Sequence, residues 1–274
     1  MEITAAAVKK LRDRTNAPMM DCKKALTEAN GDMDKAITII REKNKNITVA
    51  KADRETAEGR IAVNIDAVKQ VGVILELRCE SAPVAKSEQF IALAHDLVKE
   101  AVFHGVDSIE KLLALPKAVE RISETIGLLR ENIKPARLTR LPGLLGSYVH
   151  HDGSVGVLLQ VEGASADAQL LRDLCMHITA KNPLAGLREE VSADLIAKET
   201  EIAKAQIASD PKNANKPPNI LEMIAVGKIK TWLAENILVE QPFVKDDTKT
   251  VGQLLSSSGL KLVKFVRYKV GELS

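Results

Sequence analysis

The chain has 274 residues, of which 28% are charged and only 3% are aromatic. It carries 39 Lys and Arg against 37 Asp and Glu, so no strong field of one sign draws it to nucleic acid or to a membrane surface. The few aromatic side chains leave little for stacking against single-stranded bases. The length allows one large hydrophobic core or two to three small ones.

The cysteines and the first residues indicate a cellular compartment. Cys22, Cys79 and Cys175 are far apart in the sequence and odd in number, which offers neither a disulfide framework nor the paired spacing of a zinc site. The first residues lack the basic start and apolar run of an export signal, and no stretch approaches the roughly 20 apolar residues of a membrane span. We therefore expect a soluble, cytoplasmic protein in a reducing environment.

Residues 1–43 predict a bundle of three short helices. Thr4 is suited to cap the first helix, the second ends at Gly31, and the third begins at Asp32. In the second and third helices, apolar residues recur at i, i+3, i+4 and i+7, which gives each helix one narrow apolar stripe. Three such stripes can meet in a small core.

Two methionines at the start of the second helix are candidates for a contact surface. Met20 points about 160° away from the stripe that contains Cys22, so we expect it to be exposed. Methionine is over-used where a surface must adapt to a partner. Met19 fits either this surface or a gap in the small core.

A polar run at 44–58 has the composition of a linker, and the pattern then changes to strands. Alternating apolar residues at 61–65 predict a half-buried strand, and the almost continuous apolar run "VGVILEL" at 71–77 predicts a central strand. A helix capped by Ser87 and a further helix follow. Residues 59–140 are therefore predicted to form a first core subdomain with one sheet and helices.

The same order of elements recurs in residues 141–274. Asp152 and Gly153 predict a hairpin turn, and the strand "VGVLLQV" at 155–161 matches the central strand of the first subdomain. A helix-loop-helix insertion at about 192–236 predicts an antiparallel hairpin, and an apolar strand near the end of the chain completes the second sheet. The fold class is therefore α+β, with a duplicated core of two sheets facing helices.

A search of the sequence for catalytic chemistry finds no assembled site. The glycines of "GSYVHHDGSVG" lack a following Gly-Lys-Ser/Thr, so we expect no direct nucleotide binding. Cys79 ends an apolar strand with no His near it in sequence, which favours a buried structural thiol over a nucleophile. His150 and His151 point to opposite sides of a strand, so at most one joins Cys175 or His177 in a metal site. We expect no metal, no cofactor and no enzymatic activity.

Several segments together resemble the bacterial elongation factor Ts family. The resemblance runs in order from Glu2 to about Gly271, and the first segment is highly specific. It implies a ubiquitin-associated-like N-terminal bundle, a duplicated core and a helical-hairpin insertion, which is the architecture predicted above. The segments are "LRDRTNAPMMDCKKALTEANGDMDKAI", "VGVILELRCES" with "PVAK", "ENIKPARL", "GSYVHHDGSVGVLL", "MHITAKNP", "QPFV" and "TVGQLL".

The resemblance implies a function in protein biosynthesis. A member of this family is a guanine-nucleotide exchange factor that binds the GTPase elongation factor Tu, preferentially in its nucleotide-free form. It promotes GDP release during polypeptide elongation by disturbing the phosphate-loop and magnesium region of its partner. No membrane and no specific nucleic acid are implied as partners, and whether the helical hairpin makes the complex a dimer of heterodimers stays open.

Position by position, the resemblance implies three groups of partner-binding residues. Arg12, Met19 and Met20 match the N-terminal surface that touches the partner's nucleotide domain. His150, with Tyr148 beside it, matches a core histidine that helps displace the phosphate-loop side. The third group follows Cys79, where the family has a Thr-Asp-Phe-Val run, and consists of Glu80, Ser81, Ala82, Pro83 and Val84.

This third group also departs from the family pattern. Ala82 stands at the position of the Asp and Pro83 at that of the Phe, so the acidic group and the aromatic wedge are both missing. Ala136 likewise stands where the first of two arginines is usual, with Arg137 at the second. Three explanations of this departure stay open. In the first, the turn still docks on the partner, with a smaller wedge. In the second, a changed partner compensates and exchange rests on the His150 side, and in the third, exchange is weakened and an elongation factor Tu binding or chaperone-like role is left.

Two other classes of function compete with this interpretation. The N-terminal bundle alone is compatible with a general protein-interaction adaptor, and a duplicated α+β core with Lys-rich helices is compatible with an RNA-binding scaffold. The near-neutral charge argues against the RNA scaffold. The resemblance beyond the bundle argues against the adaptor.

Overall fold

The computed structural model describes residues 3–213 and 216–272 and has the predicted α+β class. The chain divides into two compact units. The first comprises Met1–Pro142, Val149–Leu158 and Val266–Ser274, and the second comprises Gly143–Tyr148 and Leu159–Phe265. Across the described residues, no helix is both long enough and apolar enough to cross a membrane.

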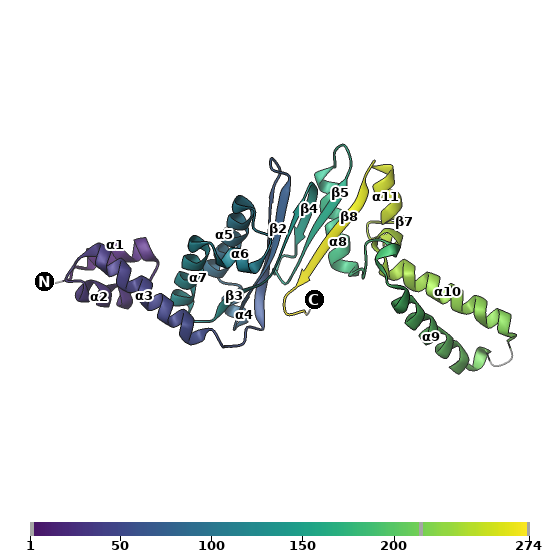
Figure 1. The fold of residues 1–274 in the computed structure, drawn as a ribbon, viewed down its shortest axis with the longest axis horizontal. Helices are drawn as coiled ribbons and strands as arrows, with labels where there is room; N and C mark the ends of the chain where they lie inside the picture. The colour runs from purple at the N-terminus through teal and green to yellow at the C-terminus, as the bar shows by residue number, and fades with distance from the viewer. Residues whose placement is uncertain (1–2, 214–215, 273–274) are drawn as a thin grey trace. The chain divides into compact units, whose positions relative to one another are not determined.

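The first unit begins with three helices, α1 (Ala5–Thr15), α2 (Met19–Glu28) and α3 (Met33–Lys51) (Figure 1). The predicted caps are present, because Thr4 Oγ1 accepts the N–H of Ala7 at 3.2 Å and Asp32 accepts the N–H groups at the start of α3. The apolar stripes meet in a small core, as predicted. Its buried members include Val8, Leu11, Cys22, Ala25, Leu26, Ala36 and Ile40.

The third helix is longer than the sequence predicted. Residues 44–51, which we expected to be linker, are helical because they pack on a helix of the core, α7 (Pro116–Leu129). Asn44 is buried against Gly127, where an added Cβ would lie 2.1 Å from the Asn44 amide oxygen. Thr48 Oγ1 donates to Ser123 Oγ at 3.2 Å. Polar residues thus pair across helices and give a segment with linker composition a packed face.

The first sheet has three antiparallel strands in the order β1-β2-β3. They are β1 (Glu58–Asp66), β2 (Val71–Cys79) and β3 (Ile133–Pro142). Strand β2 is central and buried from Val71 to Leu77, as its apolar run predicted. Helices α5 (Glu88–His104) and α7 cover one face of the sheet, and the short helices α4 (Ala82–Ala85) and α6 (Ile109–Leu113) connect the elements (Figure 1).

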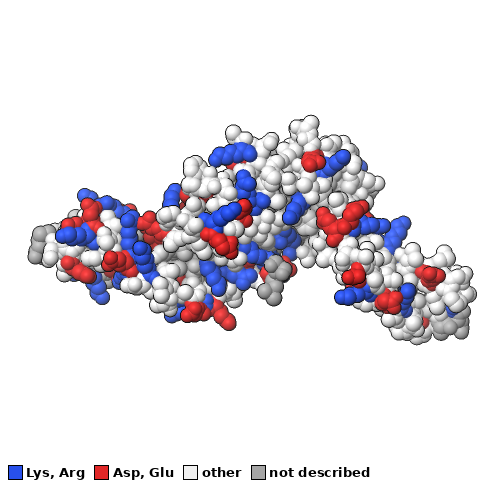
Figure 2. Space-filling view, in the orientation of Figure 1, with Lys and Arg blue, Asp and Glu red and all other residues white. Residues whose placement is uncertain are grey.

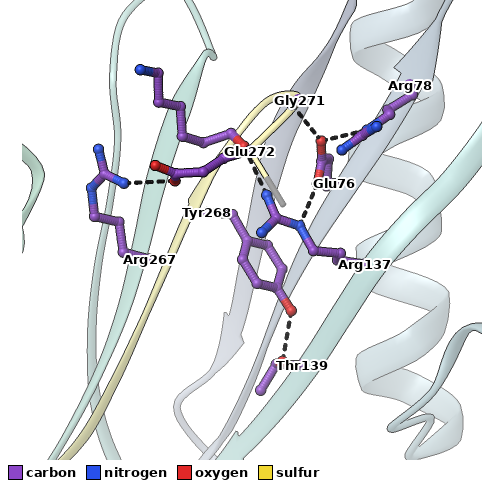
Figure 3. Close-up of polar contacts among 9 residues, drawn as sticks. Glu76, Arg78, Arg137, Thr139, Arg267, Tyr268, Gly271 and Glu272 are labelled. Atoms are coloured by element: carbon purple, nitrogen blue, oxygen red, sulfur yellow. Dashed lines mark hydrogen bonds and ion pairs between the residues drawn. The ribbon is translucent and has the colours of Figure 1, made fainter. Parts of the chain in front are cut away.

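A charged residue lies in the middle of this apolar strand. Glu76 on β2 is fully buried, and its carboxylate accepts hydrogen bonds from Arg78 Nε at 2.7 Å, from Arg137 Nε and from the Gly271 N–H at 3.0 Å (Figure 3). A buried carboxylate is tolerated only when it is paired and its oxygens are hydrogen-bonded. Glu76 therefore joins β2, β3 and the last described residues of the chain.

Arg137 extends the same network. Its guanidinium lies 4.3 Å from the centre of the Tyr268 ring, and its Nη2 donates to the Lys269 carbonyl at 2.7 Å. The Tyr268 hydroxyl lies 2.7 Å from Thr139 Oγ1 (Figure 3). Strand β3 thus binds the C-terminal segment through a cation–π contact and hydrogen bonds.

The second unit contains most of a second three-stranded sheet, in the order β4-β5-β8. The strands are β4 (Leu144–Val149), β5 (Val155–Glu162) and β8 (Lys261–Lys269), so the final strand completes the sheet as predicted. Helix α8 (Ala168–Lys181) packs closely against β4 at Gly146. A Cβ added to this glycine would lie only 2.5 Å from Leu171 Cβ. The remaining elements are β6 (Pro242–Phe243), β7 (Asp246–Thr250) and α11 (Val251–Ser257), which begins with a capping box at Thr250.

The predicted helical hairpin consists of α9 (Ala193–Ser209) and α10 (Pro218–Asn236). Ser192 caps α9, as expected, by accepting the N–H of Leu195 at 3.2 Å. A small apolar cluster packs at the base, and Ile202, Met223 and Val226 are exposed farther along the helices. Three short 3-10 helices lie at Arg188–Glu190, Pro211–Asn213 and Leu238–Glu240.

The buried ion network predicts a large stability loss on truncation of one partner. The substitution Arg137→Ala removes one of the cations that compensate Glu76, so we expect the free energy of unfolding to fall by about 3 kcal/mol. Urea-induced unfolding followed by circular dichroism measures this change. The control is Lys111→Ala, which breaks an ion pair with Asp107 whose side chains are 62% and 53% exposed. This control should lose less than about 1 kcal/mol, and equal losses in the two variants would contradict the assigned role of Glu76.

Candidate partner-binding site

The turn at residues 80–84 follows directly on β2, and the register of the first sheet determines what faces it. Cys79, the last residue of β2, lies opposite Ile133, the first residue of β3. The residues just beyond the two strand ends therefore face each other. Glu80 and Ser81 on one side meet Glu131 and Asn132 on the other.

The side chain of Glu131 holds the backbone of this turn. Its Oε2 accepts the N–H groups of Glu80 at 3.1 Å and of Ser81 at 3.0 Å. The hydroxyl of Ser81 donates to the other carboxylate oxygen. One carboxylate thus satisfies two consecutive backbone donors and a side-chain donor, which is the kind of charge-assisted bonding that orders a turn.

Glu80 makes a second set of hydrogen bonds. Its carboxylate accepts the N–H of Asn132 at 2.6 Å and Arg54 Nη1 at 3.4 Å. The Asn132 side chain in turn donates to the carbonyls of Ala52 at 3.1 Å and Arg54 at 2.7 Å. The Asn132 N–H, followed by the charge of Arg54, lowers the pKa of Glu80. These roles of Arg54, Glu131 and Asn132 were not predicted from the sequence, although Glu131 and Asn132 begin the family segment "ENIKPARL".

The surface that the turn offers is smaller than predicted from the sequence. Glu80 and Ser81 use their polar groups in hydrogen bonds within the chain, and Val84 packs against the core. Pro83 is exposed and Ala82 is half-buried. Of the residues predicted to contact a partner here, Ala82 and Pro83 therefore have the freest side chains. A four-residue helix, α4, starts at Ala82, before the predicted helix that Ser87 caps.

Cys79 is the structural thiol that the sequence predicted. It is buried, and its Sγ donates to the Ser81 carbonyl at 3.4 Å. Burial, and then the negative charge of Glu131, raise the pKa of Cys79 to about 12. Since the thiolate is the reactive form, this residue is a poor nucleophile at neutral pH.

The N-terminal candidates lie on the surface of the three-helix module. Arg12 is exposed on α1, and Met19 and Met20 at the start of α2 are 43% and 63% exposed. The exposure of Met20 was predicted, and that of Met19 places it on the surface rather than in the small core. Met20 also borders a shallow depression of about 360 Å³, which is lined further by Lys23, Lys24, Thr27 and Glu28.

The remaining candidates, Tyr148 and His150, lie at the end of β4. His150 is half-buried in the loop to β5, and its backbone accepts the Gly153 N–H at 2.8 Å and donates to the Val155 carbonyl at 2.9 Å. Gly153 has φ 77°, the left-handed conformation that the predicted Asp-Gly turn requires. The N–H of Ser154 lowers the pKa of the Asp152 carboxyl, and the nearby imidazoles add to this effect.

The rings of His150 and Tyr148 have aromatic and cationic neighbours. The ring of His150 lies 4.4 Å from that of His151, measured between centroids. Tyr148 is half-buried, and the Arg172 guanidinium lies 5.7 Å from the centre of its ring.

His177, considered above as a metal ligand, belongs instead to a buried hydrogen-bond network. Its Nδ1 accepts the N–H of Val244 at 3.1 Å, so its Nε2 carries the proton and donates to Gln241 Oε1 at 2.9 Å. Burial lowers the pKa of this imidazole and keeps it neutral. The segments "MHITAKNP" and "QPFV" are therefore joined by this histidine. Among the described residues, no group of His, Cys, Asp and Glu is placed to hold a metal ion.

The candidate residues lie in the N-terminal helices, in the 80–84 turn and around the end of β4, and charges of both signs are interspersed over the face seen in Figure 2. The family described as elongation factor TS matches residues 83–272. The chain belongs to the elongation factor Ts family, as the resemblance predicted.

Curated relatives extend this match over nearly the whole chain. The elongation factor Ts of Methylococcus capsulatus is 40% identical over 280 residues, covering 99% of this chain and 93% of that protein. The elongation factors Ts of Acidithiobacillus ferrooxidans and Thioalkalivibrio sulfidiphilus are 41% and 42% identical, each over 99% of this chain and 93% of their own length. The similarity therefore includes the N-terminal helices, the core and the hairpin.

The neutral state of His177 predicts acid sensitivity. Because its pKa is lowered from the ordinary value of 6.5, the unfolded chain takes up this proton first as the pH falls. The stability contributed by the neutral imidazole is present in full above pH 6.5 and is lost as the pH falls below it. We expect thermal unfolding to show a lower midpoint at pH 5.5 than at pH 7.5.

A substitution isolates the contribution of this residue. His177→Asn places an amide oxygen where Nδ1 accepts the backbone N–H but cannot titrate, so the variant should lose less stability than the wild type between pH 7.5 and 5.5. The control His104→Asn removes an exposed imidazole and should retain the wild-type loss. If His177→Asn shows an undiminished loss on acidification, the role assigned to His177 is wrong.

Proposed function

We propose that this protein is a guanine-nucleotide exchange factor for elongation factor Tu, which binds that GTPase and promotes GDP release during polypeptide elongation. The observation that carries the proposal is the similarity to elongation factors Ts along almost the entire chain. The match covers the N-terminal helices, the 80–84 turn and the loop of His150, which are the segments that supply the partner contacts.

Exchange by such a protein needs no bond to be made or broken. The factor must bind the nucleotide-free partner better than the GDP-loaded one, and GDP must then weaken binding of the factor by the same ratio. Each tenfold gain in the release equilibrium corresponds to about 1.4 kcal/mol of such differential contact. The side chains that matter are those that the loaded partner cannot accommodate.

The three groups of exposed residues take separate roles in this proposal. Arg12, Met19 and Met20 supply adaptable binding area on the nucleotide domain of the partner. His150, with Tyr148 beside it, acts on the phosphate-loop side. The 80–84 turn acts on the magnesium side with Ala82 and Pro83, which form a smaller wedge than the family's Asp and Phe.

A second candidate function rests on the composition of that turn. Ala82 and Pro83 offer no acidic group and no aromatic ring, and the acidic Glu80 is hydrogen-bonded within the chain. This favours, as the alternative, a protein that binds elongation factor Tu with weakened exchange activity, in a chaperone-like role.

One assay separates the candidate functions. Release of fluorescent GDP from elongation factor Tu is followed by stopped flow with and without the protein, and the proposal predicts a strong acceleration. Binding without acceleration would support the weakened-exchange alternative or a general adaptor. Affinity for RNA that falls steeply with salt would support an RNA scaffold instead.

A sharper prediction compares the contributions of His150 and of the 80–84 turn to GDP release. His150→Ala should slow the accelerated release by about tenfold, because it removes a group that acts only when GDP leaves, whereas Pro83→Ala removes little from an already small wedge. His151→Ala, at the adjacent exposed position, is the matched control and should retain the wild-type rate. A larger effect of Pro83→Ala than of His150→Ala would refute this division of roles.

A further inference from the structure

Two residues outside the three predicted groups hold the 80–84 turn in place. Glu131 and Asn132 lie between α7 and β3, in the same compact unit as the turn. Glu131 binds the backbone of Glu80 and Ser81 through its side chain, and Asn132 binds the Glu80 carboxylate through its N–H. These bonds are made to Glu80 and Ser81, while Pro83 is exposed and Ala82 is half-buried.

We infer that Glu131 and Asn132 are positioning residues for the binding of elongation factor Tu. They fix the conformation in which the turn presents Ala82 and Pro83, without touching the partner themselves. The inference rests on the proposed function, because it assigns these residues to the site that the proposed partner would contact.

The capping pattern of α4 is the first argument. Ser81 is the N-cap residue of α4, a position at which a serine hydroxyl usually accepts an N–H group of its own helix. In the described structure, the Ser81 hydroxyl instead donates to Glu131, and α4 has only four residues. So short a helix is not stable by itself. The bonds to Glu131 therefore set its first turn.

The chemistry of the exposed residues is the second argument. The side chains of Ala82 and Pro83 have no polar atoms with which to orient themselves on a partner, so their position must be set by the rest of the chain. Ordering a loop before binding removes an entropic cost from the binding step. A carboxylate that satisfies both N–H groups of Glu80 and Ser81 provides this order, since half-buried backbone donors are costly to leave without acceptors.

Asn132 connects the same turn to the N-terminal helices. Its side chain donates to the carbonyls of Ala52 and Arg54, which follow α3, while Arg54 pairs with Glu80. The end of α3 and the start of α4 are thus held by one pair of adjacent residues. Loss of the hydrogen bonds made by Glu131 and Asn132 would therefore disorder the turn, because its contacts at the start of α4 and at the end of α3 would both be lost.

The test measures binding by calorimetry against nucleotide-free elongation factor Tu, together with GDP release. Glu131→Ala removes the acceptor for all three donors, and we expect it to weaken binding by about tenfold while the protein remains folded at the assay temperature. Glu131→Gln retains an amide oxygen that can face the two N–H groups, and it should recover most of the affinity. Circular dichroism and urea unfolding give the folded fraction of each variant.

A matched control distinguishes positioning from a general loss of stability. Asp167→Ala removes another carboxylate that accepts a backbone N–H, that of Gln169 at 2.7 Å at the start of α8. This variant should lose stability but keep the wild-type affinity. Glu131→Ala combined with Pro83→Ala should show less than additive losses, whereas its combination with His150→Ala should be additive.

The outcomes separate the inference from the proposed function. If the wild type neither binds elongation factor Tu nor accelerates GDP release, the proposed function and the inference both fall. If the wild type binds and a folded Glu131→Ala variant binds equally well, the inference alone is overturned. If Glu131→Ala does not fold, Ser81→Ala removes only the hydroxyl bond to Glu131, and its undiminished affinity would likewise overturn the inference.

Discussion

The pairing of Glu76 with Arg137 across β2 and β3 is the constraint on which the first unit depends. A buried carboxylate must keep its cation, so the two strands cannot slip by one residue without exposing apolar side chains and separating this pair. With the register fixed, Cys79 lies opposite the first residue of β3, and Glu131 meets Ser81 beyond the strand ends. The ion pair, together with the register shift at Ala136, therefore sets which residues lie opposite the turn.

Much of the fold followed from local patterns in the sequence. The central strand at 71–77, the helix caps and the exposure of Met20 could be predicted because neighbours along the chain decide them. Strand β3 could not, because Pro135 lacks an N–H and argues against a strand. The structure accommodates it on an edge strand beside a register shift that leaves Ala136 unpaired. The extension of α3 and the hydrogen bond from the Glu80 N–H to Glu131 could not be predicted either, because they depend on partners more than 50 residues away in sequence.

The candidate site was predictable in position but not in detail. The resemblance to the family located the turn, the methionines and His150, and it also revealed that Ala82 and Pro83 replace an acid and an aromatic ring. It did not reveal that Glu80 and Ser81 are bound within the chain. A sequence motif gives residue types in order, whereas the use of each polar group depends on what the tertiary structure places opposite it. The turn is consequently a small, firmly held surface rather than a set of polar contacts.

In the proposed function, this chain acts through a difference in binding free energy and not through chemistry of its own. The most direct test is calorimetric measurement of its affinity for nucleotide-free and for GDP-loaded elongation factor Tu, together with the affinity of GDP for the partner with and without the chain. The account predicts tighter binding to the nucleotide-free form, by the same factor by which the chain weakens GDP binding. Equal affinity for the two forms would contradict it.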